Sequence, residues 1–181
     1  YPPGSTFKVV TALEYMREHP NDYQDFQYTC TGHTNIGSLS IQCYGGAVHG
    51  TVNLEEAVEK SCNTAFVHLA EKVDKDKLAS LAGDLMYNSK ISIDLQATSS
   101  RFTFNGDSGI NELAQTAIGQ GKTLITPLQN AMVMCAIAND GVMMRPYLVD
   151  QVKNIDGGVI KENEAEELAS PLEKSECDVL K

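Results

Sequence analysis

The sequence predicts a mainly α-helical domain with minor β content. Three observations support this class: apolar residues recur at helical spacing in several segments, helix-start signals precede two of these segments, and only short stretches alternate as strands do. The chain has 181 residues, of which 42% are hydrophobic, and this suffices for a sizeable core. We therefore expect one domain over residues 1–181.

The first predicted helix runs from Ser5 to about Arg17, directly after the turn Pro3-Gly4. Its apolar residues lie on most sides of the helix, which indicates a central position in the fold. Residues 19–50 are rich in Gly, Thr, Asn and aromatic residues. Short alternating stretches there, such as residues 39–42, predict small hairpins within irregular structure.

Further helices are predicted in the middle of the chain. Asn53 and Glu56 form a capping-box pattern that opens a helix continuing through Val58. The tripeptide Ser61-Cys62-Asn63 interrupts this helix. Helical periodicity returns over residues 64–73, 75–86 and 110–118, whereas residues 87–108 show none.

A stronger start signal stands at Thr126, where the threonine can cap, Pro127 suits the first helical position and Gln129 completes a capping box. The helix should run to Asn139. Because residues 131–138 are apolar almost all round, we expect this helix to be buried, with Cys135 as a small buried hydrophobe.

The C-terminal part, residues 142–162, predicts a hairpin around the turn Asp156-Gly157-Gly158. Residues 163–181 are predicted to form a linker and the start of a helix. The glutamates at its beginning are interpreted as a solvated acidic stretch rather than as a metal site.

Charge excludes one class of partner. The 24 acidic residues outnumber the 14 Lys and Arg residues, giving a net charge of −10, and no basic block occurs, so nucleic acid is excluded as the main partner. No apolar run reaches the roughly 18 residues of a membrane span, so the chain as given is expected to be soluble. It begins without Met and ends within a predicted helix, and we expect it to be a fragment.

Cysteine spacing predicts neither a metal site nor a cofactor. None of the five cysteines forms a C-x-x-C pair, and neither His49 nor His68 has a partner at the usual ligand spacing. Cys30 and Cys43 flank a Gly-rich loop and are candidates for a disulfide, with the free thiols as the equal alternative. Cys62 is interpreted as a space-filling residue.

Two short patterns carry chemistry. In Ser5-Thr6-Phe7-Lys8 the helical spacing puts a hydroxyl and an amine on one face, and burial would lower the pKa of the amine enough for it to accept the serine proton. Each of S-x-x-K and S-x-N is expected about once by chance in such a chain, so either alone could be only a capped helix or a helix break. Occurring together and in this order, they match a known signature of penicillin-binding proteins and β-lactamases.

Further short motifs strengthen the match. His49-Gly50 lies between the two patterns, and Gly119-Gln120-Gly121 and Thr126-Pro127-Leu128-Gln129 follow them. With these residues, the chain up to about Val152 resembles the transpeptidase domain of a penicillin-binding protein, most closely the class B type. The resemblance implies an acyl-serine enzyme of peptidoglycan crosslinking that uses no cofactor.

The resemblance also implies roles. Ser5 would attack the D-Ala-D-Ala carbonyl of a stem peptide, or the ring of a β-lactam antibiotic, and Lys8 would be its base. Ser61 would relay a proton to the leaving amine, and Asn63 would bind the substrate amide while holding Lys8. The full-length protein would lie at the extracytoplasmic face of the bacterial membrane, tethered there among cell-wall synthesis partners.

The family's third motif, K-T-G, does not occur, and Lys122-Thr123-Leu124 is the nearest approach. We therefore expect a partial domain: the helical portion of a β-lactamase/transpeptidase-like α/β fold, with most of the central sheet absent and turnover impaired. One alternative is a serine β-lactamase or β-lactam sensor. Another is a non-catalytic helical binding module.

Overall fold

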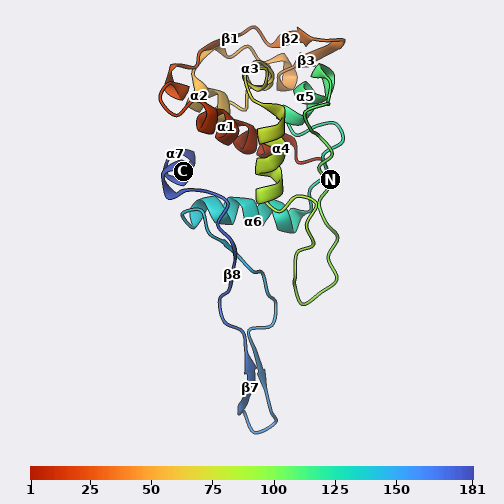
Figure 1. Cartoon of the computed structure of the whole chain (residues 1–181), viewed down its shortest axis with the longest axis vertical. Helices are drawn as coiled ribbons and strands as arrows, with labels where there is room; N and C mark the ends of the chain where they lie inside the picture. The colour runs from red at the N-terminus through yellow and green to blue at the C-terminus, as the bar shows by residue number, and fades with distance from the viewer.

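A computed structural model describes all of residues 1–181. Helices form the body of the molecule, and a narrow β extension projects from one end of it (Figure 1). The α-helices are α1 (Phe7–Glu18), α2 (Leu54–Glu59), α3 (Asn63–Ala70), α4 (Lys75–Asp84), α5 (Ile110–Ala117), α6 (Pro127–Ala138) and α7 (Lys174–Leu180). Three 3-10 turns accompany them: η1 (Gly4–Thr6), η2 (Tyr23–Asp25) and η3 (Tyr44–Gly46).

The strands pair two by two, and all pairs are antiparallel. The pairs are β1 (Tyr28–Cys30) with β4 (Gly50–Val52), β2 (His33–Ile36) with β3 (Leu39–Gln42), β5 (Met143–Met144) with β8 (Glu167–Ala169), and β6 (Gln151–Lys153) with β7 (Val159–Glu162). The hairpins predicted within residues 19–50 and around Gly157 are thus present, with irregular segments between them.

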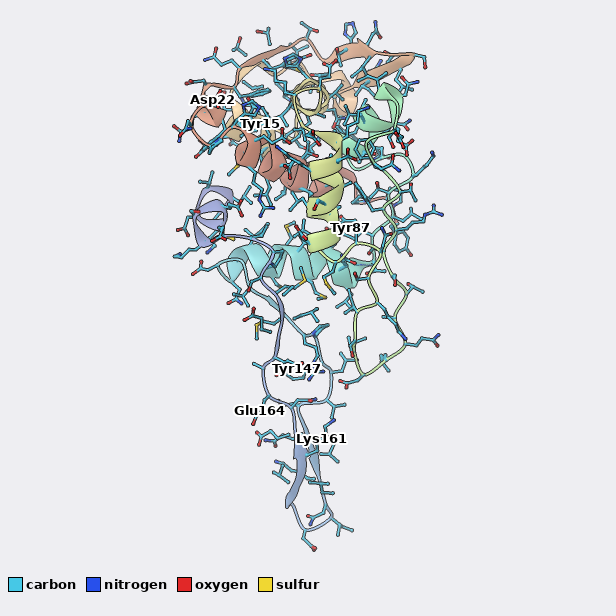
Figure 2. All side chains as sticks on the ribbon, viewed as in Figure 1. Tyr15, Asp22, Tyr87, Tyr147, Lys161 and Glu164 are labelled. Atoms are coloured by element: carbon cyan, nitrogen blue, oxygen red, sulfur yellow. The ribbon has the colours of Figure 1, made fainter.

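Helix α1 lies at the centre of the body, as its apolar surface predicts. It packs against α2, α3, α4, α5 and α7. At its start Phe7 is buried, with its ring stacked on Phe102 at a centroid distance of 5.8 Å and edge-on to Tyr87 at 6.0 Å. This aromatic cluster, near the label of Tyr87 in Figure 2, anchors the N-terminal turn of α1.

Both predicted helix-start signals act as caps, with one difference. The side chains of Asn53 and Glu56 form a complete capping box at α2. Thr126 accepts a hydrogen bond from the backbone of Gln129, but the Gln129 side chain does not complete a box. It is buried instead, and its Nε2 donates to the Leu85 carbonyl at 2.6 Å, because that carbonyl follows the end of α4 and lacks a helical partner.

The prediction that α6 is buried all round is wrong. Only one face is covered, through Met132, Val133, Ala136 and Ile137, while Cys135 is exposed. The reason is position: α6 lies at the edge of the helical body, where neighbours reach it from one side (Figure 1). Apolar composition alone therefore did not predict the environment of Cys135.

The C-terminal segment leaves the body and returns to it. The β6 and β7 hairpin stands at the far end of the extension, and Tyr147, Lys161 and Glu164 lie along the extension, away from the helices (Figure 2). The chain then returns through β8 to α7, so residues 163–181 contain a strand as well as the expected helix.

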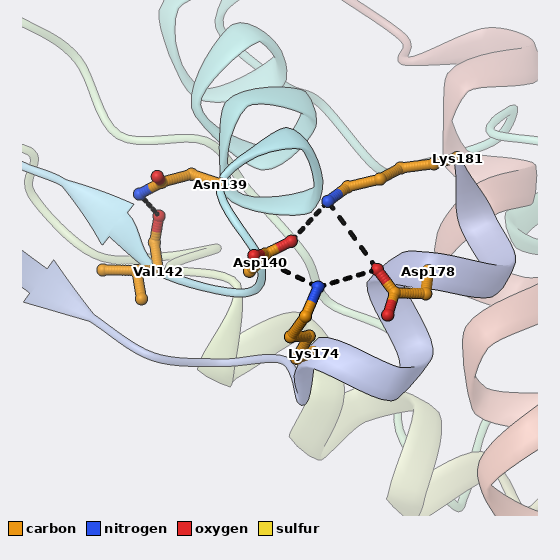
Figure 3. Close-up of polar contacts among 6 residues, drawn as sticks. All are labelled: Asn139, Asp140, Val142, Lys174, Asp178 and Lys181. Carbon is orange, nitrogen blue, oxygen red and sulfur yellow. Dashed lines mark hydrogen bonds and ion pairs between the residues drawn. The ribbon is translucent and has the colours of Figure 1, made fainter.

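Two groups of ion pairs connect α7 to the rest of the helical body. Asp140, just after α6, pairs with Lys174 at 3.2 Å and Lys181 at 2.5 Å, and Asp178 joins the same group (Figure 3). These charges are exposed, so they contribute little to stability. The less exposed pair of Arg17 and Glu176 is bidentate, with N···O distances of 2.6 and 2.9 Å, and is the stronger attachment.

None of the helices combines the length and the apolar character needed to cross a membrane.

Glu14 is a buried acid on α1 and gives a first prediction. Burial, with the charge of Glu18, raises its pKa to about 7, although Arg17 and Lys77 oppose the shift. A carboxyl with a raised folded-state pKa favours folding in its protonated form, so stability is lost as the pH rises toward 7. We expect Glu14→Gln to raise the free energy of unfolding by about 1–3 kcal/mol near pH 8 and to change it little near pH 4.

Urea unfolding of both proteins at the two pH values measures this difference. The exposed Glu59→Gln is the matched control and should change neither value. An effect of Glu14→Gln that is the same at both pH values would contradict a titrating buried carboxyl.

Candidate active site

Ser5 lies in the 3-10 turn η1, which continues directly into α1. The sequence places Ser5 at a helix start, and the structure agrees, but its hydroxyl caps nothing because neither η1 nor α1 has a side-chain cap. Ser5 is exposed, whereas Lys8, one turn later, is only 2% exposed. An accessible hydroxyl therefore stands beside a buried amine, with 3.3 Å between Ser5 Oγ and Lys8 Nζ.

The Lys8 amine contacts the other three predicted site residues, Ser5, Ser61 and Asn63. Its Nζ lies 2.9 Å from Ser61 Oγ, 2.7 Å from the Ser61 carbonyl oxygen and 2.6 Å from Asn63 Oδ1. These partners come from the break between α2 and α3, more than fifty residues away in the sequence. The structure thus brings together Ser5, Lys8, Ser61 and Asn63, as the motif pattern predicts.

Ser61 has an unusual backbone that directs it toward Lys8. Its φ is 49°, in the left-handed region, and its N–H and that of Cys62 bond back to the carbonyls of Val58 and Ala57. These two bonds form a Schellman motif, in which glycine is the usual left-handed residue. A serine there costs of order 1–3 kcal/mol in strain, which is typical of functional sites. A serine in place of glycine at the left-handed end of α2 is therefore a signal of a functional site that the sequence motifs did not use.

Asn63 begins α3, and its amide group is held at both ends. Its Nδ2 donates to the carbonyl oxygen of Gln42 at the end of β3, at 2.7 Å. That bond fixes which end of the amide is oxygen and turns Oδ1 toward Lys8. The β2 and β3 hairpin therefore positions a residue of the site.

Burial shifts Lys8 toward its neutral form, which becomes a minor but accessible species at neutral pH. Burial lowers the pKa of Lys8 to about 8, even though the neighbouring thiols of Cys62 and Cys43 raise it. All its hydrogen-bond partners are uncharged groups. A neutral amine has one lone pair, and among its partners only the hydroxyls of Ser5 and Ser61 can donate a proton to it. The arrangement can therefore move a proton between either hydroxyl and Lys8.

Gly119 supports the turn that carries Ser5. Gly4 N–H donates to the Gly119 carbonyl at 2.8 Å, and the two backbones are in direct contact. A Cβ added to Gly119 would lie 1.9 Å from the Gly4 carbonyl oxygen, and Gly119 also has a φ of 68°. Only glycine fits, which accounts for this part of the Gly119-Gln120-Gly121 sequence.

The structure decides between the two alternatives left open for Cys30 and Cys43. Cys30 and Cys43 are free thiols with their Sγ atoms 3.7 Å apart, so the disulfide alternative is not present. Cys62 and His49 lie beside them, and the ligand atoms of all four residues are within 4.8 Å of one another. His49 has no partner at the usual ligand spacing in the sequence, but strand pairing brings together residues that sequence spacing keeps apart.

A serine beside a buried lysine, with a second serine and an asparagine on the same amine, is the kind of site in which lysine activates a serine nucleophile. Comparison with known proteins agrees with this class. The family model described as penicillin binding protein transpeptidase domain matches residues 1–179. The chain belongs to this family.

Individual relatives are similar over most of this chain. It is 40% identical to the peptidoglycan D,D-transpeptidase PbpA of Mycolicibacterium smegmatis and 33% identical to the stage V sporulation protein D of Bacillus subtilis, over 86% and 83% of its length. The matched parts amount to 32% and 23% of those proteins, so the chain spans a third or less of their length.

Solved structures agree in fold. PBPA from Mycobacterium tuberculosis superposes with a TM-score of 0.88 at 33% identity, covering 99% of this chain and 42% of that one. The imipenem acyl-enzyme complex of the same protein gives a TM-score of 0.89, with the same coverage. The fold described above is thus that of a penicillin-binding protein transpeptidase domain over the compared residues.

The contact of Gly119 with Gly4 gives a second prediction. We expect Gly119→Ala to destabilise the chain by about 1–3 kcal/mol, because left-handed strain adds to a steric clash with the Gly4 carbonyl. Thermal unfolding measures the loss. Gly83→Ala is the matched control, since Gly83 lies in α4 with open space around it, and it should be neutral or stabilising. Equal effects of the two substitutions would contradict the tight contact.

Proposed function

We propose that this chain carries the nucleophile half of a peptidoglycan D,D-transpeptidase active site that also binds penicillin. One observation carries the proposal: the buried Lys8 amine contacts the exposed hydroxyl of Ser5 while Ser61 and Asn63 hold it from the other side. A serine hydroxyl needs a neighbour that accepts its proton at neutral pH, and a lysine with a pKa of about 8 suits that task.

In the first step, Ser5 Oγ attacks the carbonyl between the two terminal D-Ala residues of a stem peptide. The Ser5 proton moves to neutral Lys8, and the carbonyl becomes a tetrahedral oxyanion. Ser61 Oγ, 2.9 Å from Lys8 Nζ, donates its proton to the leaving amine and takes in its place the proton held by Lys8. The C–N bond then breaks, D-Ala departs, and the peptide stays on Ser5 as an ester.

In the second step, an amino group of another stem peptide attacks this ester. The same proton path runs in reverse, restoring the Ser5 hydroxyl and forming the crosslink. The Asn63 amide, fixed by Gln42, keeps Lys8 in place and binds the substrate amide. A β-lactam acylates the same serine through its strained ring. The acyl-enzyme structures of the Mycobacterium tuberculosis relative support this part of the proposal.

The domain boundaries form part of the proposal. We place residues 1–181 in a partial transpeptidase domain, mainly helical, in which residues 142–162 form a hairpin and residues 163–181 lead onward. The central sheet with the K-T-G strand would come from outside these residues. Loss of one oxyanion donor costs about 2.7–4 kcal/mol in acyl transfer, so the 181 residues alone should react slowly.

The proposed setting follows from the substrate. Peptidoglycan stem peptides lie outside the cytoplasmic membrane, so the full-length protein would act at the extracytoplasmic face with other cell-wall synthesis proteins. The relatives named as peptidoglycan D,D-transpeptidases support that assignment.

Covalent labelling tests the proposed nucleophile. We expect overnight incubation with millimolar fluorescent penicillin to add one adduct that peptide mass spectrometry maps to Ser5, formed slowly. Lys8→Met, which keeps the length of the side chain, should slow the labelling by about 10²–10⁴-fold, because general base catalysis is lost. Intact mass against time gives both rates.

Ser5→Ala should abolish the adduct, and the matched control Ser99→Ala, an exposed serine away from the site, should not. The absence of any Ser5 adduct would contradict the proposed nucleophile and favour a non-catalytic binding module. An adduct that survives in Ser5→Ala would do the same. Rapid release of the penicillin product would favour the β-lactamase alternative instead.

A further inference from the structure

A group of four sulfur and nitrogen donors, Cys30, Cys43, His49 and Cys62, includes the middle residue of the Ser61-Cys62-Asn63 segment. We name these four residues the sulfur cluster. The three cysteines are buried and His49 is half-buried. Each residue comes from the end of a different element at the end of the body that holds β1, β3 and the start of α3 (Figure 1).

Strand pairing assembles the sulfur cluster. Cys30 ends β1 and pairs with Gly50 of β4, which puts His49, the residue before Gly50, next to Cys30. Cys43 follows β3, and its N–H donates to the Gly32 carbonyl at 2.9 Å. Gly32 has a φ of 89°, and a Cβ there would meet the Gly46 carbonyl oxygen at 2.9 Å, so a glycine is required to close the loop.

Three separations between donor atoms match the edges of a tetrahedral metal site, and all four donor atoms lie within 4.8 Å of one another. Zinc binds thiolate sulfur at about 2.3 Å and histidine nitrogen at about 2.0–2.1 Å, so tetrahedral edges are about 3.8 Å between sulfurs and about 3.6 Å from sulfur to nitrogen. In the sulfur cluster Cys30 and Cys43 Sγ are 3.7 Å apart, Cys43 and Cys62 Sγ 3.8 Å, and Cys30 Sγ and His49 Nδ1 3.5 Å.

The same distances exclude a disulfide in this arrangement, since bonded sulfurs lie about 2.0 Å apart. A further feature favours ionised sulfur at Cys30. The Gly32 N–H donates to Cys30 Sγ at 3.3 Å, and charged acceptors form the stronger hydrogen bonds. We infer that Cys30, Cys43, His49 and Cys62 bind one structural Zn²⁺ ion.

The chemistry of the donors selects the metal. Three thiolates and one imidazole in a tetrahedral arrangement are typical of structural zinc, and oxygen-preferring ions such as Mg²⁺ and Ca²⁺ do not suit such ligands. All four positions are protein ligands, so the site is closed to substrate. On binding, the three thiols release their protons to solvent and the imidazole binds through its neutral Nδ1.

Zinc would brace the second motif of the proposed active site. Cys62 stands between Ser61 and Asn63, the two residues that hold the Lys8 amine, and it precedes the first turn of α3. Ser61 also has strained backbone geometry, which the surrounding structure must maintain. A metal bond to Cys62 would fix that segment, with Cys30 and Cys43 connecting it to β1 and β3.

Metal analysis of the purified chain is the direct test. We expect about one zinc per chain by mass spectrometry of the metal content after gel filtration in zinc-free buffer. Replacement with Co²⁺ should give the sulfur-to-cobalt charge-transfer band and the visible bands of tetrahedral cobalt. His49→Cys should keep the metal and strengthen the charge-transfer band, while His49→Ala should weaken metal retention.

Control variants distinguish the loss of a metal ligand from the loss of folding. Cys135→Ser removes an exposed thiol outside the sulfur cluster and should retain full metal. The His49 variants alter a half-buried loop residue, so circular dichroism should show them folded. A folded wild-type chain that binds neither zinc nor cobalt, or an intact mass lower by two hydrogens with fewer titratable thiols, overturns the proposal. These measurements do not depend on Ser5 acylation.

Hydrogen exchange tests the bracing of the second motif. Removing the metal with a strong chelator should increase amide exchange by at least tenfold at residues 61–66. Amides of α6, far from the sulfur cluster, should change little. Unchanged exchange at residues 61–66 after metal removal would contradict a bracing role.

Discussion

The buried Lys8 amine is the constraint on which the site depends. A lysine taken out of water must find hydrogen-bond partners, and Lys8 finds them in Ser5, Ser61 and Asn63. These contacts join the start of α1 to the break between α2 and α3. The amine is therefore both a link between two parts of the chain and, because burial lowers its pKa to about 8, a group able to exchange a proton.

Other parts of the helical body keep these contacts in place. Phe7 packs in its aromatic cluster directly before Lys8, and Gly119 contacts the backbone just before Ser5. At the break between α2 and α3, Gln42 orients the Asn63 amide, and Cys62 belongs to the sulfur cluster. Each support comes from a different element, so the geometry of a few polar atoms depends on most of the helical body.

The sequence predicted the features that depend on residues close together in the chain. The capping box at Asn53, the helix start at Thr126 and the turn at Gly157 depend on residues close in sequence, and all are present. The four polar site residues were predicted from the S-x-x-K and S-x-N motifs, which the penicillin-binding proteins share. Residues assembled by strand pairing were missed: His49 meets Cys30 only because Gly50 pairs with that cysteine. The exposed face of α6 was also missed, since composition does not reveal which neighbours reach a helix.

A direct titration of the Lys8 side chain tests the central claim. NMR of the chain with ¹³C-labelled lysine, assigned through Lys8→Met, follows the ε-carbon shift against pH. The account predicts a midpoint near the value of about 8 that burial imposes, well below the ordinary lysine value of 10.5. A midpoint near the ordinary value of 10.5 would leave Lys8 with far less free amine at neutral pH than a pKa of about 8 does, and would contradict its role as the base.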